Sequence, residues 1–505
     1  MSNIVVDDVV IGSGPTGWAA CMGIWARGGR PVVIDIGYSE TRRSSESVIR
    51  NPMVKPKLKF DSDHMYRFPL SALGVVLPEG VVPLSGARGG YSTVWGSGIQ
   101  PVSEADVQEA PITVRHSWLE SSKKLLSHMD VLGRNDLLSR RDPWPIEPHD
   151  QVATSTRFRK ILERADNERL FESTDVLYGS PRLAITGSTD RSRKNACTLC
   201  GQCMSGCPEG SIFDSGIAIE DGIQEFGGEI MTGTVTKILR EESVSQPFEV
   251  LSVVEFDVGD GRTKQIKARR IYLAAGPIGT PLILQKSGLA PSVIEVRDSQ
   301  MFYSAFFSLD SFDPKGQSMA TSQGYFSTKP DVSREQEFSM SVYEHSIDFR
   351  TRLEQMVPKV IKPLIGALNP ITQRIVPGIG FLSQDVSGTI RLNYDGHRTS
   401  LELCQSQTAK SAIKFARKRL RRTSRFLGLI QLPNPFRNPT VGAGFHAGAS
   451  MPMGEKPDSL VDWSGKLKAL PSVRIVDASS LMRIKAGSHT FMAMANAHRI
   501  AQSVD

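Results

Sequence analysis

The sequence predicts an α/β protein with two domains, one built on a mainly parallel sheet and the other on an antiparallel sheet. The chain has 505 residues, which exceeds what one hydrophobic core usually supports. Near the amino terminus an apolar strand, a glycine-rich turn and a helix start follow one another, which is typical of a parallel α/β sheet. Between about residues 300 and 400, polar and apolar residues alternate in runs such as 302–307 and 388–392, which predicts antiparallel strands.

Composition and the amino-terminal segment indicate a folded protein without a secretory signal. Aliphatic, aromatic and cysteine residues make up 40% of the chain and charged residues 22%, as in ordinary globular domains. Residues 1–3 lead directly into the strand-like run 4–6, without the basic segment and long apolar run of a signal peptide. No stretch approaches about 18 uninterrupted apolar residues, so we expect no transmembrane helix and a cytoplasmic location.

A nucleotide-binding fingerprint lies near the start of the chain. The strand-like run 9–11 is followed by Gly12, Gly14 and Gly17 in a G-x-G-x-x-G pattern, and then by a helix start. The first glycine permits the tight turn, the second lets the backbone approach a pyrophosphate, and the third allows close packing of helix on strand. Asp35 ends the second predicted strand at about the spacing expected for a ribose-binding carboxylate. Since strand, helix and acid are all in place, we expect a Rossmann-like dinucleotide site rather than a glycine-rich turn without a ligand.

Four cysteines stand close together in a C-x2-C-x2-C-x3-C-P pattern, the spacing of bacterial ferredoxins: Cys197, Cys200, Cys203 and Cys207, followed by Pro208. The pattern predicts an iron-sulfur cluster, with 4Fe-4S preferred. If Cys207 is not a ligand, a 3Fe-4S cluster or a fourth ligand from Cys404 remains open. The alternatives are a zinc site and free or disulfide-paired thiols. Only Cys21 and Cys404 remain elsewhere, so a secreted disulfide framework is not expected.

The formal net charge is +7, and much of it comes from one basic segment, 410–425, in which apolar residues interleave with lysines and arginines. A solvated basic helix face is the ordinary interpretation. An amphipathic helix that contacts an anionic membrane or an acidic electron acceptor is the alternative, so peripheral membrane contact stays open. Because no recognition module accompanies the charge, we expect no nucleic-acid partner.

A second apolar pattern precedes the basic segment. Between Leu353 and Leu368, apolar residues recur at helical spacing around Pro358 and Pro363. This pattern predicts core packing, with a lid over an apolar substrate entrance as the alternative.

Four further segments resemble signatures of the glucose-methanol-choline (GMC) oxidoreductases: 86–96, 276–289, 473–479 and 489–495. In that family the first is a glycine-rich loop that lies along the FAD, and the last two form the carboxy-terminal flavin segment. The resemblance spans both ends and the middle of the chain. It implies FAD as the cofactor and, besides the fingerprint glycines and Asp35, assigns FAD binding to Gly89, Gly90, Ser92, Val235, Ala275, Asp477, Thr490 and Phe491.

Three residues depart from the family pattern. Tyr91 stands where the family usually has a small residue, and Ala290 replaces the last glycine of the second signature. Trp95 stands where many members have Asn or His, and this variant resembles sugar-oxidising branches. Cysteine-rich inserts occur in branches that act on sugars, sterols or long-chain alcohols, so the insert does not fix the substrate.

Two histidines are the candidates for catalysis. An alcohol gives up hydride to a flavin only as its hydroxyl proton leaves, so a base must lie within hydrogen-bond reach, and imidazole titrates in the right range. His446 lies in 442–454, which resembles the family segment with the first active-site histidine, and His489 lies where the family has its second. We expect His446 to act as general base and His489 to orient the alcohol oxygen, with the roles exchangeable. The alternative is a pair of buried histidines with structural roles.

Together these features predict a Rossmann-like FAD-binding domain assembled from 1–100, 195–290 with the cysteine insert, and 441–505. The remaining segments, 101–194 and 291–440, are expected to form an α+β substrate domain with the antiparallel sheet. The resemblance implies that hydride is taken from an alcohol CH–OH group, by preference of a sugar or glycoside, and that electrons pass through the iron-sulfur cluster to an external acceptor. An alcohol oxidase with structural cysteines and a non-redox lyase are the alternatives.

Overall fold

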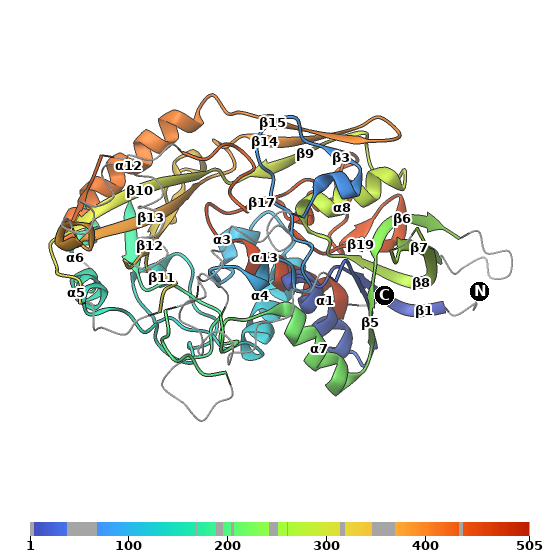
Figure 1. The fold of residues 1–505 in the computed structure, drawn as a ribbon, viewed down its shortest axis with the longest axis horizontal. Helices are drawn as coiled ribbons and strands as arrows, with labels where there is room; N and C mark the ends of the chain where they lie inside the picture. Colours follow the sequence, from blue (N-terminus) through green and yellow to red (C-terminus); the bar gives the residue numbers. More distant parts are fainter. Residues whose placement is uncertain are drawn as a thin grey trace.

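A computed structural model of the chain describes residues 5–37, 68–167, 169–187, 195–201, 203, 207–241, 251–259, 261–313, 319–345, 369–433 and 438–503. Three sheets organise these residues. In Figure 1 the largest sheet lies at the right, a six-stranded sheet lies at the left, and a five-stranded sheet runs along the top between them. The predicted α/β class with a separate antiparallel sheet is confirmed.

The largest sheet has eight strands and draws on three distant parts of the chain. Its main path runs β18-β19-β8-β1-β2-β5, with β6 and β7 attached to β8. The pairs β1–β2, β1–β8, β8–β19 and β2–β5 are parallel, which is the arrangement that the glycine fingerprint predicts. The bounds are β1 Val5–Ile11, β2 Val32–Asp35, β5 Glu229–Thr232, β6 Thr234–Arg240, β7 Ser252–Asp257, β8 Thr263–Leu273, β18 Lys466–Leu467 and β19 Leu470–Ile475.

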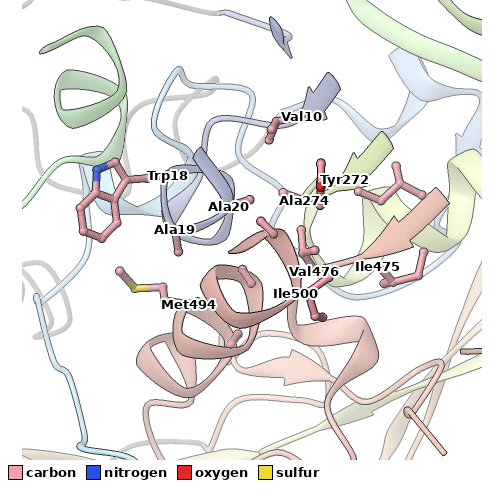
Figure 2. Close-up of a cluster of buried hydrophobic side chains, with 14 of the residues drawn as sticks. Val10, Trp18, Ala19, Ala20, Tyr272, Ala274, Ile475, Val476, Met494 and Ile500 are labelled. Atoms are coloured by element: carbon pink, nitrogen blue, oxygen red, sulfur yellow. The ribbon is translucent and has the colours of Figure 1, made fainter. Parts of the chain in front are cut away.

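Helices from both ends of the chain meet over this sheet. The tightest pair is α1 against α13, where a Cβ on Gly23 would come within 2.6 Å of the carbonyl oxygen of His498. Figure 2 shows the apolar core that they share with β1, β8 and β19, including Val10, Tyr272 and Ile500. Each fully buried side chain of this kind stabilises the fold by roughly 1.5–3 kcal/mol. The helices on this sheet are α1 Pro15–Ala26, α4 Ile112–Ser127, α7 Ser215–Phe226, α8 Gly276–Lys286 and α13 Thr490–Gln502.

The six-stranded sheet is antiparallel throughout, in the order β16-β10-β13-β12-β11-β4. The run 302–307, predicted as an antiparallel strand, lies in β10. Helices α5 and α12 pack their apolar faces on this sheet and close a second core. The bounds are β4 Val176–Gly179, β10 Met301–Ser308, β11 Ser322–Thr328, β12 Phe338–Tyr343, β13 Ile375–Leu382, β16 Leu429–Gln431, α5 Thr156–Ala165 and α12 Ala409–Phe426.

The five-stranded sheet connects the other two, in the order β17-β9-β14-β15-β3. The run 388–392 falls at the start of β14, so this predicted strand lies in a different sheet from β10. The bounds are β3 Val75–Val76, β9 Val293–Asp298, β14 Thr389–Tyr394, β15 Thr399–Cys404 and β17 Ala447–Gly448. The short helical elements are α3 Glu104–Val107, α6 Arg169–Glu172, α11 Asn369–Thr372, η1 Leu70–Leu73, η2 Gly90–Thr93, η3 Leu137–Arg140, η5 Arg334–Gln336 and η6 Ala478–Ser480.

Strands cross the domain boundaries drawn from the sequence at two points. β3 and β17 come from the first and last segments and join the five-stranded sheet, whose other strands lie in 291–440. β4, from 101–194, joins the six-stranded sheet and so stays within the segments assigned to the substrate domain. The boundaries themselves stay a prediction. The apolar pattern between Leu353 and Leu368 lies outside the described residues. Across the ranges that the structure does describe, every helix is too short or too polar to cross a bilayer.

Candidate active site

A cavity of about 760 Å³ opens between the largest sheet and the six-stranded sheet. One end is lined by the carboxyl ends of β1, β2 and β8 and by the loops that follow them. The other end is lined by side chains of β10, β11, β12 and β13. In open α/β sheets, ligands bind at the carboxyl ends of the strands, so this position suits a dinucleotide with a substrate next to it.

The fingerprint glycines form the turn between β1 and α1. Gly12 has φ +101°, and a Cβ at this position would overlap the carbonyl oxygen of Ala274. A Cβ on Gly17 would overlap the carbonyl oxygen of Gly12, which explains the close approach of helix and strand. Helix α1 begins with Pro15 after Gly14, and no side chain among the described residues caps it. Its first backbone N–H groups therefore remain for an anion in the cavity, which fits a pyrophosphate.

Asp35 lines the cavity and also holds two loops together. Its Oδ2 accepts hydrogen bonds from the backbone N–H (2.8 Å) and hydroxyl (2.7 Å) of Ser13, and its Oδ1 accepts one from the N–H of Gly37 (2.7 Å). The Ser13 hydroxyl in turn accepts from the N–H of Gly89 at 2.8 Å. Burial raises the pKa of Asp35. No sequence pattern singles out Ser13, although it joins the fingerprint to the 86–96 loop.

The 86–96 loop lies directly against the fingerprint turn. Gly89 has φ +96°, and a Cβ on Gly90 would stand 3.1 Å from the Cα of Gly14. Ser92 is 2% exposed, and its hydroxyl lies 2.9 Å from that of Ser215 at the start of α7. Because both loops carry glycines at this contact, their backbones approach each other closely beside the cavity.

Most residues predicted to bind the cofactor line this cavity, and three do not. The lining includes Gly12, Gly14, Asp35, Gly90, Ser92, Val235, Ala275, Asp477 and Thr490, whereas Gly17, Gly89 and Phe491 lie behind it. Asp477 uses its carboxylate within the protein: it accepts from the N–H of Gly276 and the N–H of Ser479, each at 2.9 Å, and from the hydroxyl of Thr280. It thereby fixes the start of α8 against η6. Direct contact of these residues with FAD stays a prediction.

The two predicted catalytic histidines lie together in the cavity. Their ring centroids are 5.5 Å apart, with the rings at 69° to each other. His446 stacks on Phe381 of β13, with centroids 4.0 Å apart, and is partly exposed to the cavity. His489 is 5% exposed, and its Nε2 donates a hydrogen bond to the carbonyl oxygen of Ala447 at 3.1 Å. The Nδ1 atoms of both rings have no hydrogen-bond partner among the described residues.

Both imidazoles are kept neutral. Burial, with a smaller contribution from the neighbouring His489, lowers the pKa of His446 to about 3. Burial also lowers the pKa of His489 to about 4. Because Nε2 of His489 donates to Ala447, its Nδ1 carries the lone pair of the neutral ring. At neutral pH each ring therefore offers an unprotonated nitrogen.

The loop that carries His446 is strained and anchored from β9. Phe445 (φ +60°) and Ala449 (φ +48°) lie on either side of the histidine in the left-handed region, which is unfavourable for residues with a side chain. The N–H of Ser299 donates to the carbonyl oxygen of His446 at 2.9 Å. Asp298, 1% exposed, accepts from the N–H of Gly442 at 3.0 Å, and burial raises its pKa to about 7. The sequence analysis missed Asp298 because only the fold brings it beside this loop.

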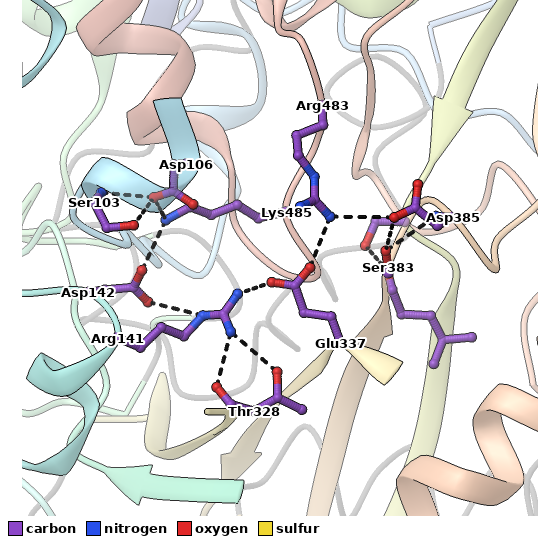
Figure 3. A network of polar contacts seen from close by, with 12 residues as sticks. Ser103, Asp106, Arg141, Asp142, Thr328, Glu337, Ser383, Asp385, Arg483 and Lys485 are labelled. Carbon is purple, nitrogen blue, oxygen red and sulfur yellow. Dashed lines mark hydrogen bonds and ion pairs between the residues drawn. The ribbon is translucent and has the colours of Figure 1, made fainter. Parts of the chain in front are cut away.

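A network of buried ion pairs anchors the loop that carries His489 (Figure 3). Nζ of Lys485 lies 2.6 Å from Oδ2 of Asp106 and 3.2 Å from Oδ1 of Asp142. Burial opposes the charge of Lys485, but the two carboxylates outweigh it and raise its pKa. Two residues earlier, Arg483 contacts Glu337 at 3.0 Å, and Glu337 also pairs with Arg141. The loop is thus tied both to the 101–142 region and to β12.

The far end of the cavity carries many hydroxyl groups. Three strands of the six-stranded sheet, β10, β11 and β12, contribute them to the cavity lining: Tyr303, Ser322, Tyr325, Ser339, Ser341 and Tyr343. A Cβ on Gly487, two residues before His489, would come within 2.7 Å of the hydroxyls of Tyr325 and Ser339. This wall can donate and accept several hydrogen bonds to a small polar molecule.

Comparison with known protein families accounts for this arrangement. The amino-terminal GMC oxidoreductase model matches residues 145–296, and the carboxy-terminal GMC oxidoreductase model matches residues 383–497. The chain belongs to the GMC oxidoreductases. As a member of this family it is an FAD-dependent oxidoreductase, and the glycine turns and the uncapped start of α1 fit the cofactor.

A solved structure has the same fold as this GMC oxidoreductase. The crystal structure of pyridoxine 4-oxidase from Mesorbium loti superposes with a TM-score of 0.60 at 14% sequence identity, and the match covers 98% of each chain. At this identity the likeness concerns the fold alone. None of the curated proteins compared matches the sequence of this chain.

The cysteine insert of this GMC oxidoreductase lies next to the cavity wall. Cys197, Cys203 and Cys207 pack on the same apolar cluster as Trp95, which itself lines the cavity. Burial, with a contribution from the neighbouring thiols, raises the pKa of Cys203 to about 12. Within the ranges that the structure describes, no three metal-ligating side chains are arranged to hold an ion. The cluster therefore stays a prediction, and the thiols would have to lose their protons to bind it.

We expect the replacement of Gly12 by Ala and the replacement of Gly14 by Ala to have different effects. Gly12→Ala should destabilise the fold by about 1–3 kcal/mol, because the Cβ overlaps Ala274 and the backbone is left-handed. Gly14→Ala should leave the unfolding temperature of the FAD-free protein unchanged and weaken FAD retention, because its Cβ meets only the cavity. Thermal unfolding and flavin absorbance of both variants test this. A Gly14→Ala protein that keeps FAD as tightly as the wild type would place the cofactor elsewhere.

Proposed function

We propose that this GMC oxidoreductase oxidises the CH–OH group of an alcohol, by preference a sugar or glycoside, at the two histidines. The observation that carries the proposal is the pair of neutral imidazoles, 5.5 Å apart, in the cavity that the glycine loops line. The hydroxyl-rich wall formed by β10, β11 and β12 favours a substrate with several hydroxyl groups, since each can find a partner there. Bound FAD supplies a two-electron acceptor for the hydride.

The roles of the two histidines follow from their surroundings. His446 is partly exposed to the cavity, so we assign it the removal of the hydroxyl proton. The ring of His489 is fixed by its hydrogen bond to Ala447, and we assign it the orientation of the alcohol oxygen. Phe381 packs against the ring of His446, with the two rings tilted by 31°. The roles remain exchangeable, because both rings present an unprotonated nitrogen.

The direct test is to mix the FAD-loaded protein with candidate alcohols and sugars without oxygen. Loss of the oxidised flavin absorbance on mixing is the expected result. A non-redox lyase would convert its substrate while the flavin stays oxidised, and that result would remove the proposal.

The cysteine insert supports a route for electrons out of the protein. Cys197, Cys200, Cys203 and Cys207 would hold an iron-sulfur cluster, 4Fe-4S before 3Fe-4S, and the cluster would supply one-electron transfer to an external acceptor. Cys197, Cys203 and Cys207 pack on one apolar cluster with Trp95, which lines the cavity, so a metal cluster held by these thiols would lie beside the cavity. Iron analysis with electron paramagnetic resonance of anaerobically purified protein tests the cluster. Zinc without iron, together with hydrogen peroxide formation in air, would favour an oxidase with a structural cysteine site.

We expect the rate of flavin reduction to be independent of pH between about pH 5 and 8. A histidine base works when unprotonated, and the lowered pKa values, about 3 for His446 and about 4 for His489, keep both rings neutral over this range. The rate should fall only as the pH drops through these values. Stopped-flow measurement of flavin reduction against pH tests this. An acid limb centred near the ordinary imidazole value of about 6.5 would show that burial does not control the base.

A further inference from the structure

A corner of the molecule away from the FAD end combines exposed cations with exposed aliphatic side chains. Helix α12 lies on the outside of the six-stranded sheet, at the upper left of Figure 1 and on the opposite side of the molecule from β1. Its buried face, which includes Ile413, Ala416 and Leu420, packs on that sheet. The other face is free of the sheet and carries the charges of the basic segment.

The outer face of α12 is uniformly positive. Six cations are exposed along it, most of them spaced by three or four residues so that they fall in one stripe: Lys410, Lys414, Lys418, Arg421, Arg422 and Arg425. The helix contains neither Asp nor Glu. Like charges at this spacing destabilise a helix, so the stripe is not explained by the stability of α12. Nearby acids are already paired, since Asp175 contacts Arg419 and Asp310 contacts Arg164.

Three large aliphatic side chains are exposed beside the carboxyl end of this stripe. Leu309 is 59% exposed, Ile371 56% and Ile430 48%. Hydrogen bonds of the backbone bring these residues close together. The N–H of Leu309 donates to the carbonyl oxygen of Gly428, which lies two residues after the end of α12. Strand β16, which contains Ile430, begins at the next residue. Ile371 lies in α11, shortly before Arg374 in the chain. The carbonyl oxygen of Arg374 accepts a hydrogen bond from the N–H of Ser308, the residue before Leu309.

We infer that the cation stripe of α12 and the trio Leu309, Ile371 and Ile430 form a docking surface for an anionic lipid membrane. Lysine and arginine side chains are drawn to anionic headgroups, while adjacent aliphatic side chains enter the boundary between headgroups and acyl chains. A nucleic acid or an acidic protein would match the charge, but it would leave the most exposed aliphatic side chain of the described residues, Leu309, without an apolar environment.

A hydrogen bond connects α12 to a residue at the substrate end of the cavity. Nη2 of Arg417, on the side of α12, donates to the carbonyl oxygen of Tyr303 at 2.8 Å, and Tyr303 lines the cavity. The inner face of the sheet that α12 covers carries the hydroxyl-rich wall. A membrane bound at α12 would therefore lie behind the substrate sheet and leave the FAD end facing the aqueous phase.

The test is co-sedimentation of the full-length, FAD-loaded protein with vesicles of phosphatidylcholine, with and without one third phosphatidylserine. We expect binding only to the anionic vesicles, and weaker binding as salt is added. Replacing Lys414, Lys418 and Arg422 together by Gln should lower the partition constant on the order of 100-fold, since each cation near an anionic surface contributes about 5-fold. Leu309→Ser with Ile430→Ser should lower it by at least about 10-fold.

The matched control replaces three exposed lysines on other elements, Lys123, Lys264 and Lys456, by Gln, which removes the same charge from other faces. This variant should bind anionic vesicles within a few-fold of wild type. Equal losses in the control and the α12 variant would reduce the effect to net charge and overturn the assignment. So would failure to bind anionic vesicles, or binding to RNA or polyglutamate without binding to vesicles.

Discussion

Replacing His446 by Ala should leave FAD bound and lower the rate of flavin reduction by an alcohol by about 10²–10⁴-fold. The ring lies 5.5 Å from that of His489 and packs on Phe381 at the cavity wall, so its loss removes the nitrogen best placed to take the hydroxyl proton. FAD retention should be unaffected, because the glycine turns at the other end of the cavity are untouched. Stopped-flow absorbance under anaerobic conditions measures the rate.

Two further variants separate loss of the base from loss of packing. His446→Gln keeps a polar side chain of similar size but offers no titrating nitrogen, so it should be nearly as slow as His446→Ala. His116→Ala, at an exposed position on α4, should react at the wild-type rate. A His446→Gln enzyme with near wild-type flavin reduction would transfer the base role to His489, and full activity in both His446 and His489 variants would remove the proposed mechanism.

Replacing Lys485 by Met should destabilise the protein by roughly 3–5 kcal/mol. The ammonium group is the partner of Asp106 at 2.6 Å and of Asp142 at 3.2 Å, and the side chains of Lys485, Asp106 and Asp142 are only 8%, 11% and 6% exposed. Without it, Asp106 is left buried without a cation, and Asp142 keeps only the longer contact with Arg141 at 3.9 Å. Because Lys485 lies four residues before His489, we also expect slower flavin reduction at temperatures where the variant is folded. Chemical denaturation of the FAD-loaded protein measures the stability.

An exposed ion pair provides the control for this prediction. Arg334 and Glu109 lie 2.7 Å apart, but their side chains are 46% and 47% exposed. Arg334→Met should therefore change stability by about 0–1 kcal/mol. Adding Asp106→Asn to Lys485→Met should recover part of the loss, because one uncompensated buried charge is removed. A Lys485→Met protein as stable as Arg334→Met would show that the network of Figure 3 does not hold the loop.

Local chemistry explains what the sequence could predict. The turn at Gly12 needs a left-handed backbone and a close approach to Ala274, and only glycine allows both. The glycine pattern in the sequence therefore predicts the nucleotide-binding turn. Alternation likewise predicted strands at 302–307 and 388–392. It did not predict that they belong to different sheets, because alternation indicates a strand and says nothing about its partner.

Residues whose contacts join positions far apart in the chain could not be predicted from the sequence. Asp298 anchors the loop of His446 across 144 positions of the chain, and Lys485 meets Asp142 across 343. An isolated buried acid or lysine has no neighbouring pattern in sequence, so its partner becomes visible only in the fold. The family resemblance found His446 and His489 because it carries such long-range information, and it could not supply partners that are particular to this chain.

The central claim is that the reactive ring of FAD and both histidines share one cavity. The most direct measurement is a crystal structure of the protein loaded with FAD. We expect the pyrophosphate at the start of α1 and the rings of His446 and His489 on the same face of the flavin, next to the hydroxyl-rich wall. A flavin ring that lies away from both imidazoles, or between them so that they flank opposite faces, would contradict it.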